Sequence, residues 1–148
     1  MRTLLAMLSL ALAVAGCSAP RMRTASGRPE VTIKGQTMEQ LKAHFVNDLT
    51  ARGYTLRNDS PKAMVFEKRE TGAISLLFRS ELDAKAWNRV KLKLIDRGKG
   101  AHRAICTAFL VGNKDSPFEQ EKEVVSEWED IQAWLERTKA SLESSPNK

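Results

Sequence analysis

The hairpin predicted between residues 89 and 111 constrains the fold of this chain more than any other stretch. From residue 89 to residue 96, Arg89, Lys91 and Lys93 alternate with Val90, Leu92 and Leu94. Such strict alternation predicts a strand with one face in the core and the other in solvent. Residues 97–100 (Arg-Gly-Lys-Gly) predict a hairpin turn, and residues 101–111 predict the strand that returns. A chain with this hairpin needs an antiparallel sheet whose outer face is basic.

Four further strands and one helix are predicted before this hairpin. Apolar alternation and turn residues predict strands at residues 30–34, 54–57, 63–68 and 73–79, a turn at 58–61 and a longer connection at 80–87. The helix is predicted over residues 38–52, with the apolar stripe Met38, Leu41, Phe45 and Leu49. Thr37 and Gln40 have the spacing of a capping box, and Gly53 suits the position after the helix.

A second, longer helix is predicted after the hairpin. Ser116, Pro117 and Glu119 have the order of an N-cap, a first helical residue and the acidic residue of a capping box. The helix is expected to run to about residue 142. Its apolar face is expected to comprise Phe118, Val125, Trp128, Ile131, Leu135 and Leu142.

These elements occur in the order βαβββββα, so we expect the α+β class. One antiparallel sheet of five or six strands, with both helices packed on one face, accommodates this order. The domain is expected to cover residues 30–143, after a flexible linker at 17–29 and before a disordered tail at 144–148. The element order is similar to TATA-binding-protein-like and helix-grip domains. Among lipoproteins it resembles the repeated domains of the C component of the outer-membrane β-barrel assembly machine. Such folds host many functions, so this resemblance implies no activity.

Residues 1–17 have the layout of a bacterial export signal. A basic residue near the start precedes an apolar run over residues 4–14, and an Ala-Gly pair directly precedes Cys17. The apolar run is too short to span a bilayer as a permanent helix. Residues 14–17 resemble the lipobox of bacterial lipoproteins. That resemblance implies cleavage before Cys17 and acylation of its thiol and new amino terminus. A plain secretory signal peptide, with Cys17 there by chance, is the alternative.

The lipobox resemblance also implies a location. Two or three acyl chains hold a protein stably to a membrane, whereas one chain does so only marginally. In this class of lipoprotein an aspartate after the cysteine signals retention at the inner membrane. Ser18 follows Cys17 here, so the resemblance implies the outer membrane, with the domain facing the periplasm.

Basic residues dominate the body of the chain and acidic residues dominate its end. Residues 18–112 contain 18 Lys and Arg against 9 Asp and Glu, whereas residues 113–148 contain 5 against 9. A basic body attracts anionic partners. In the periplasm we expect such a partner to be an acidic envelope protein or another anionic envelope component, such as lipid headgroups, and not a nucleic acid.

The residue types that catalyse reactions or bind metals form no recognised motif. The chain has no Gly-x-Ser-x-Gly, His-Glu-x-x-His or phosphate-binding glycine motif, so we expect no enzyme, cofactor or metal. His102 and Cys106 share a predicted strand face, but they are separated by about 13 Å, too far to bind one zinc ion. We expect both His44 and His102 at an edge or surface, and Cys106 in the core. A hydrolase that uses the loop pair Glu81 and Asp83 is a remaining alternative.

Two functions are compatible with this sequence. The first is a non-catalytic binding or assembly module of the cell envelope, tethered through Cys17. Its candidate binding surface comprises Arg89, Lys91, Lys93, Arg103 and, if its side chain is exposed, Trp134. The alternative is a carrier that holds a small apolar ligand between the long C-terminal helix and the sheet. An apolar cavity of a few hundred Å³ would favour the carrier.

Overall fold

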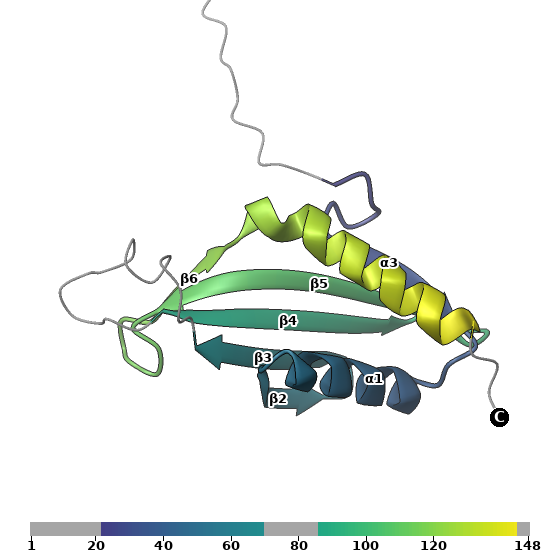
Figure 1. Cartoon of the computed structure of the whole chain (residues 1–148), viewed down its shortest axis with the longest axis horizontal. Coiled ribbons are helices and arrows are strands. Elements are labelled where there is room, and N and C mark those ends of the chain that lie inside the picture. Colours follow the sequence, from purple (N-terminus) through teal and green to yellow (C-terminus); the bar gives the residue numbers. More distant parts are fainter. Residues whose placement is uncertain (1–21, 70–85, 145–148) are drawn as a thin grey trace, which may run out of the picture.

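In the described residues of the computed structural model, 22–69 and 86–144, six strands form one antiparallel sheet and two helices pack on one of its faces (Figure 1). The strands are β1 (Glu30–Lys34), β2 (Thr55–Ser60), β3 (Ala63–Arg69), β4 (Trp87–Asp96), β5 (Ala101–Gly112) and β6 (Gln120–Glu123). The helices are α1 (Met38–Ala51) and α3 (Trp128–Ser144), and the short 3₁₀ helix η1 (Val125–Glu127) precedes α3. The predicted α+β class, with one antiparallel sheet and two helices, is confirmed, and the observed order is βαβββββα as predicted. Its last strand, however, is β6 rather than one of the strands predicted from the sequence.

The strand order in the sheet is β1-β5-β4-β3-β2, with β6 also paired to β5. Strand β5 has 12 residues, and β1 pairs with only residues 101–105 of it. Strand β6 pairs with residues 109–112, further along the same edge. Two short strands from opposite ends of the chain therefore share one edge of β5.

The core lies between the sheet and the two helices. The apolar residues of β4 predicted to face inward, Val90, Leu92 and Leu94, are all buried there. Phe45 of α1 and Trp134 of α3 meet edge to face above the sheet, with ring centroids 5.7 Å apart. Such aromatic pairs stabilise a fold beyond the contribution of their buried area. This contact joins the two helices into one layer.

Helix α1 begins and ends as its sequence predicts. The Thr37 hydroxyl accepts a hydrogen bond from the Gln40 amide, and the Gln40 side chain accepts one from the Thr37 amide. Gly53 follows the helix with a φ of +84°, a left-handed conformation that glycine adopts without strain. Both ends are determined by residues close in sequence, which explains why the prediction succeeds.

The predicted start of the second helix is wrong. Helix α3 begins at Trp128, and the predicted first turn at Pro117 is a loop followed by strand β6. The Glu119 carboxylate accepts a hydrogen bond from the Asp115 amide rather than closing a helical cap at Ser116. Residues 120–123 pair with the part of β5 that β1 leaves open. The hydrogen bonds of this pairing compete with helix formation, and local caps contribute only about 1 kcal/mol.

Two residues assigned to the apolar face of that helix lie elsewhere. Phe118 is 75% exposed, and Val125 is also exposed. The other four members of the predicted face, Trp128, Ile131, Leu135 and Leu142, are buried or partly buried. The 3.6-residue period is therefore correct only after residue 128.

Strand β2 is longer than predicted and continues through residues 58–60. The turn follows it, where the Ser60 hydroxyl both donates to the Ala63 carbonyl and accepts from the Ala63 amide. Polar side chains on this edge strand are exposed to solvent, so they do not end the strand. The predicted strand at 73–79 and the loop pair Glu81 and Asp83 lie outside the described residues.

Residues 22–29, part of the predicted linker, form hydrogen-bonded turns. The Glu30 carboxylate accepts hydrogen bonds from the amides of Ala25 and Ser26, which hold these turns to the start of β1. The free edge of β1 is covered by α3, whose Gln132 side chain bonds both the amide and the carbonyl of Glu30. Such covering protects an edge strand from pairing with other chains.

Candidate functional site

The face of the sheet opposite the helices, here called the outer face, carries the basic side chains predicted from the sequence. Arg89, Lys91 and Lys93 point to the outer face because their neighbours in β4 point into the core. In the β4–β5 register, Arg103 lies opposite Ile95 on the same face. The structure therefore brings together the four predicted basic residues on one surface.

A hollow of about 520 Å³, here called the outer hollow, lies in this face. Its apolar lining includes Val65, Ile95 and Ile105 from three adjacent strands. Its charged lining residues are Arg28, Lys62, Lys91, Lys93 and Arg103, and no acidic residue lines it in the described part of the chain. Sequence patterning missed Arg28 and Lys62, because Arg28 lies in the predicted linker and Lys62 lies in a turn.

Arg89 lies outside the outer hollow, at one end of the outer face. Its guanidinium donates to Glu67 at 2.7 Å from Nε and to Glu119 at 2.7 Å from Nη1, and it also pairs with Glu121. The Arg89 side chain is only 12% exposed and that of Glu67 only 3%. Lys114 pairs with Glu67 at 2.8 Å from the other side. We call these five residues the acid–base cluster; in it, Arg89 is neutralised and is not available to an external partner.

The other basic residues of the outer face are less constrained. Lys91 pairs with Glu121 at 2.6 Å, and Arg103 pairs with Glu30 at 3.3 Å. Lys62 and Lys93 are exposed, and their ammonium groups form no ion pair within the described ranges. As far as the described residues go, the outer hollow therefore has two cations without an ion pair and several partly neutralised ones around an apolar floor.

The acid–base cluster lowers the pKa of two carboxyl groups. The hydrogen bond from Arg89 lowers the pKa of Glu119 below its ordinary value of 4.5. Burial alone would raise the pKa of Glu121, but the hydrogen bonds from Lys91 and Arg89 outweigh it and lower that pKa. For Arg89, burial alone would lower the pKa, because it disfavours the charged form here too. The hydrogen bonds with Glu119, Glu121 and Glu67 outweigh burial and raise the pKa of Arg89. Each group is held in its charged form.

We expect acid to destabilise the fold through this cluster. Because Glu119 and Glu121 have a lower pKa when folded, the unfolded chain binds more protons at acidic pH. Their contribution to the free energy of unfolding is present above pH 4.5, the ordinary value, and is lost as the pH falls through the folded-state values. Urea denaturation over a pH series measures this loss.

The E119Q/E121Q double variant should show a flatter pH dependence than the unmodified chain. The control is E127Q/E129Q, which removes the same two charges from exposed positions at the start of the C-terminal helix. It should keep the pH dependence of the unmodified chain. An equal flattening in both variants would mean that net charge, and not the acid–base cluster, causes the acid sensitivity.

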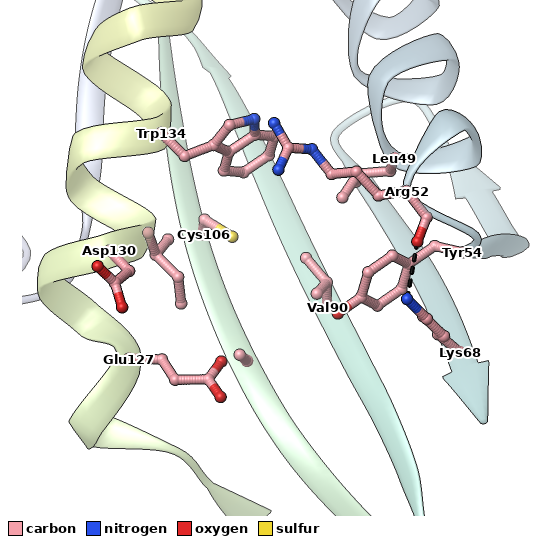
Figure 2. A pocket seen from close by; sticks show the side chains of 11 residues that line it. Leu49, Arg52, Tyr54, Lys68, Val90, Cys106, Glu127, Asp130 and Trp134 are labelled. Atoms are coloured by element: carbon pink, nitrogen blue, oxygen red, sulfur yellow. Dashed lines mark hydrogen bonds between the residues drawn. The ribbon is translucent and has the colours of Figure 1, made fainter. Parts of the chain in front are cut away.

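A second concave surface lies on the helix side, in a groove of about 350 Å³ between α1 and α3 (Figure 2). Its floor is formed by Val90, Cys106 and Ala108. Its apolar and aromatic walls include Leu49, Tyr54, Ile131 and Trp134. Its charges are balanced: Arg52 and Lys68 lie near α1, and Glu127 and Asp130 belong to the η1–α3 segment. This groove therefore has no preference for one sign of charge.

Trp134 is a core residue and not part of an exposed docking surface. It is 9% exposed, and its indole N–H donates a hydrogen bond to the Asp48 carboxylate. The Arg52 guanidinium lies over its ring, 5.7 Å from the centroid. Both side chains are labelled in Figure 2. The sequence places Trp134 beside the apolar stripe of α3, and the structure extends the buried face to include it.

Cys106 is expected to react slowly with thiol reagents in the folded chain. Its side chain is 1% exposed, and burial raises the pKa of its thiol to about 12, so little thiolate exists at neutral pH. The measurement is the rate of labelling by a bulky maleimide at neutral pH in a Cys17→Ala chain. Urea should accelerate the reaction, and a thiol introduced on the outer face by Lys93→Cys should react quickly. If the introduced thiol and Cys106 are labelled equally fast in the folded chain, the burial of Cys106 is contradicted.

The histidines form no metal site in the described residues. No group of three His, Cys, Asp or Glu side chains in those ranges is placed to hold a metal ion. His44 is half-buried on α1. The prediction of an edge or surface position is wrong for His102, which is buried. His102 pairs with Ile33 of β1 and shares the core side of β5 with Ala104 and Cys106, so the alternation of β5 directs its side chain inward.

Similarity to known proteins assigns no function to the outer hollow or to the groove between α1 and α3. No helix in the described ranges combines the length and the apolar character that a membrane span requires. Comparisons with protein-family models, curated proteins and solved structures found no match for this chain.

Proposed function

We propose that this chain is a lipid-anchored lipoprotein of the bacterial cell envelope and that its domain is a non-catalytic binding module. The lipobox resemblance of residues 14–17 supports lipid on Cys17 and a place at the outer membrane, facing the periplasm. The observation that carries the binding proposal is the lining of the outer hollow, which has five cationic and no acidic residues in the described part of the chain. The proposed partner is an anionic component of the envelope.

The chemistry of the outer hollow fits such a partner. Among the described residues, Lys62 and Lys93 have no acidic partner and can pair with external anions. The apolar floor of the hollow lowers the local dielectric and strengthens such pairs. Long lysine stems also cover apolar surface while the ammonium groups stay in water. Arg89 contributes to the fold of this face and not to the proposed contact.

Site-specific photocrosslinking in cells tests this function. A photoreactive amino acid at position 93 should give adducts with an envelope component. The same residue at position 137, which is exposed on α3, should give none. Mass spectrometry of the adduct identifies the partner. Adducts at position 137 but not at position 93 would contradict the assignment of the outer face.

A ligand carrier is the second candidate, and the groove between α1 and α3 favours it. A volume of about 350 Å³ with a floor of Val90, Cys106 and Ala108 is within the range of small-ligand sites. The charged residues at its sides would suit a ligand with an apolar body and polar ends.

Native mass spectrometry of the chain purified from membranes tests the carrier function. A carrier should retain a bound apolar molecule, and Ala108→Leu, which fills the floor of the groove, should release it. The matched control is Ala63→Leu on the outer face. A chain with no bound molecule, or one that loses it equally in both variants, would contradict the carrier.

A further inference from the structure

The start of the domain lies close to the residue proposed to carry lipid. Four residues separate Cys17 from Met22, where the described structure begins. A chain spans at most about 3.6 Å per residue, so the two Cα atoms lie no more than ~18 Å apart. Residues 22–30 are held by hydrogen bonds: the Met22 amide donates to the Gly27 carbonyl, and the Glu30 carboxylate accepts from the amides of Ala25 and Ser26. The tether is therefore short, and the domain must lie next to the bilayer.

The tether also joins the domain at the outer hollow. Ser26 and Arg28, which precede β1, line the hollow together with residues of β3, β4 and β5. Figure 1 shows this segment at the edge of the sheet, beside α3. A short tether at this edge allows either the outer face or the helix layer to turn toward the lipid.

The charges of the two faces decide between these orientations. The outer hollow has only cationic charged residues in the described ranges. The exposed acidic residues of η1 and α3 are Glu127, Glu129, Asp130, Glu136 and Glu143. The exposed or partly exposed basic residues there are Arg137 and Lys139. An anionic lipid surface therefore attracts the outer face and repels the α3 side of the helix layer, within a Debye length of about 8 Å.

We propose that the outer hollow docks on the anionic lipid surface of the membrane that holds the Cys17 anchor. This inference rests on the proposed anchoring and names the anionic partner of the same surface. Lys62 and Lys93 contact lipid phosphates, while the apolar floor faces the headgroup region. The helix layer, with the groove between α1 and α3, then faces the periplasm.

Lysine footprinting of the lipidated chain in nanodiscs tests this orientation. One sample contains phosphatidylcholine alone, and the other contains equal parts of phosphatidylcholine and phosphatidylglycerol. A water-soluble acylating reagent labels exposed lysines, and mass spectrometry gives the rate at each one. Labelling of Lys62 and Lys93 should slow roughly fivefold or more with phosphatidylglycerol, the effect of one lysine near an anionic surface. Lys139 on α3 should label at the same rate in both, and high salt should remove the difference.

Matched variants separate docking from general attraction. Lys91 also lines the hollow, so phosphatidylglycerol should slow its labelling too. K62Q/K93Q should abolish this slowing, whereas R137Q/K139Q, which removes the same number of charges, should preserve it. Equal rates in both lipids, or protection of Lys139 instead, would overturn the lipid-docking inference. If position 93 crosslinks to an acidic envelope protein while lipid has no effect, the proposed binding function stands and only the lipid-docking inference fails. A mass showing no lipid on Cys17 would overturn the proposed anchoring, and this inference with it.

Discussion

Replacement of Arg89 by methionine is expected to lower the free energy of unfolding by about 3 kcal/mol, the usual cost of removing one partner from a buried ion pair. Arg89 is the common partner of Glu67, Glu119 and Glu121. Without it, three carboxylates remain near one another at the end of the outer face, and Glu67 stays buried. Lys114 still pairs with Glu67, so the loss of unfolding free energy should not greatly exceed about 3 kcal/mol. Urea denaturation at neutral pH measures the change as a lower midpoint with an unchanged slope.

Lys93→Gln is the matched control for Arg89. The two residues lie on the same strand and the same face, but Lys93 is exposed and has no ion pair within the described part of the chain. Its replacement should change the free energy of unfolding by less than about 0.5 kcal/mol. Similar values for the two variants would show that the acid–base cluster does not stabilise the fold.

Cys17→Ala is expected to abolish lipidation and release the chain from the membrane. The proposed anchor depends on this thiol, and two or three acyl chains each contribute about 0.8 kcal/mol per buried CH₂ group. Without them, the outer hollow alone offers only weak, salt-sensitive attraction. Metabolic palmitate labelling followed by membrane fractionation measures both effects.

Cys106→Ala is the control for Cys17, because it removes the only other cysteine of the chain. Cys106 lies on the core side of the sheet and is buried, so its replacement should leave labelling and membrane retention unchanged. A Cys17→Ala chain that still takes up palmitate and sediments with membranes would refute the lipoprotein assignment.

The sequence alone was sufficient for the elements whose signals are local. The alternation of residues 89–96 predicted β4 and its buried face, because neighbouring strand residues point to opposite sides whatever surrounds them. Thr37, Gln40 and Gly53 predicted both ends of α1, because caps depend on contacts within four residues. The α+β class followed from the order of such elements.

Tertiary contacts decided the features that depend on distant partners. Helix α3 starts at Trp128 because residues 120–123 pair with β5, and the sequence contains no local sign of that edge. Arg89 and Lys93 are equivalent in the alternating pattern, yet Arg89 is enclosed by Glu67, Glu119 and Glu121, whereas Lys93 is exposed and has no ion pair among the residues that the structure describes. These glutamates belong to β3, β6 and the turn before β6, so chain folding alone brings them to Arg89. Local propensities are weak compared with such long-range hydrogen bonds and ion pairs. Which basic residues of the outer face remain available to a partner is therefore decided only when the sheet assembles.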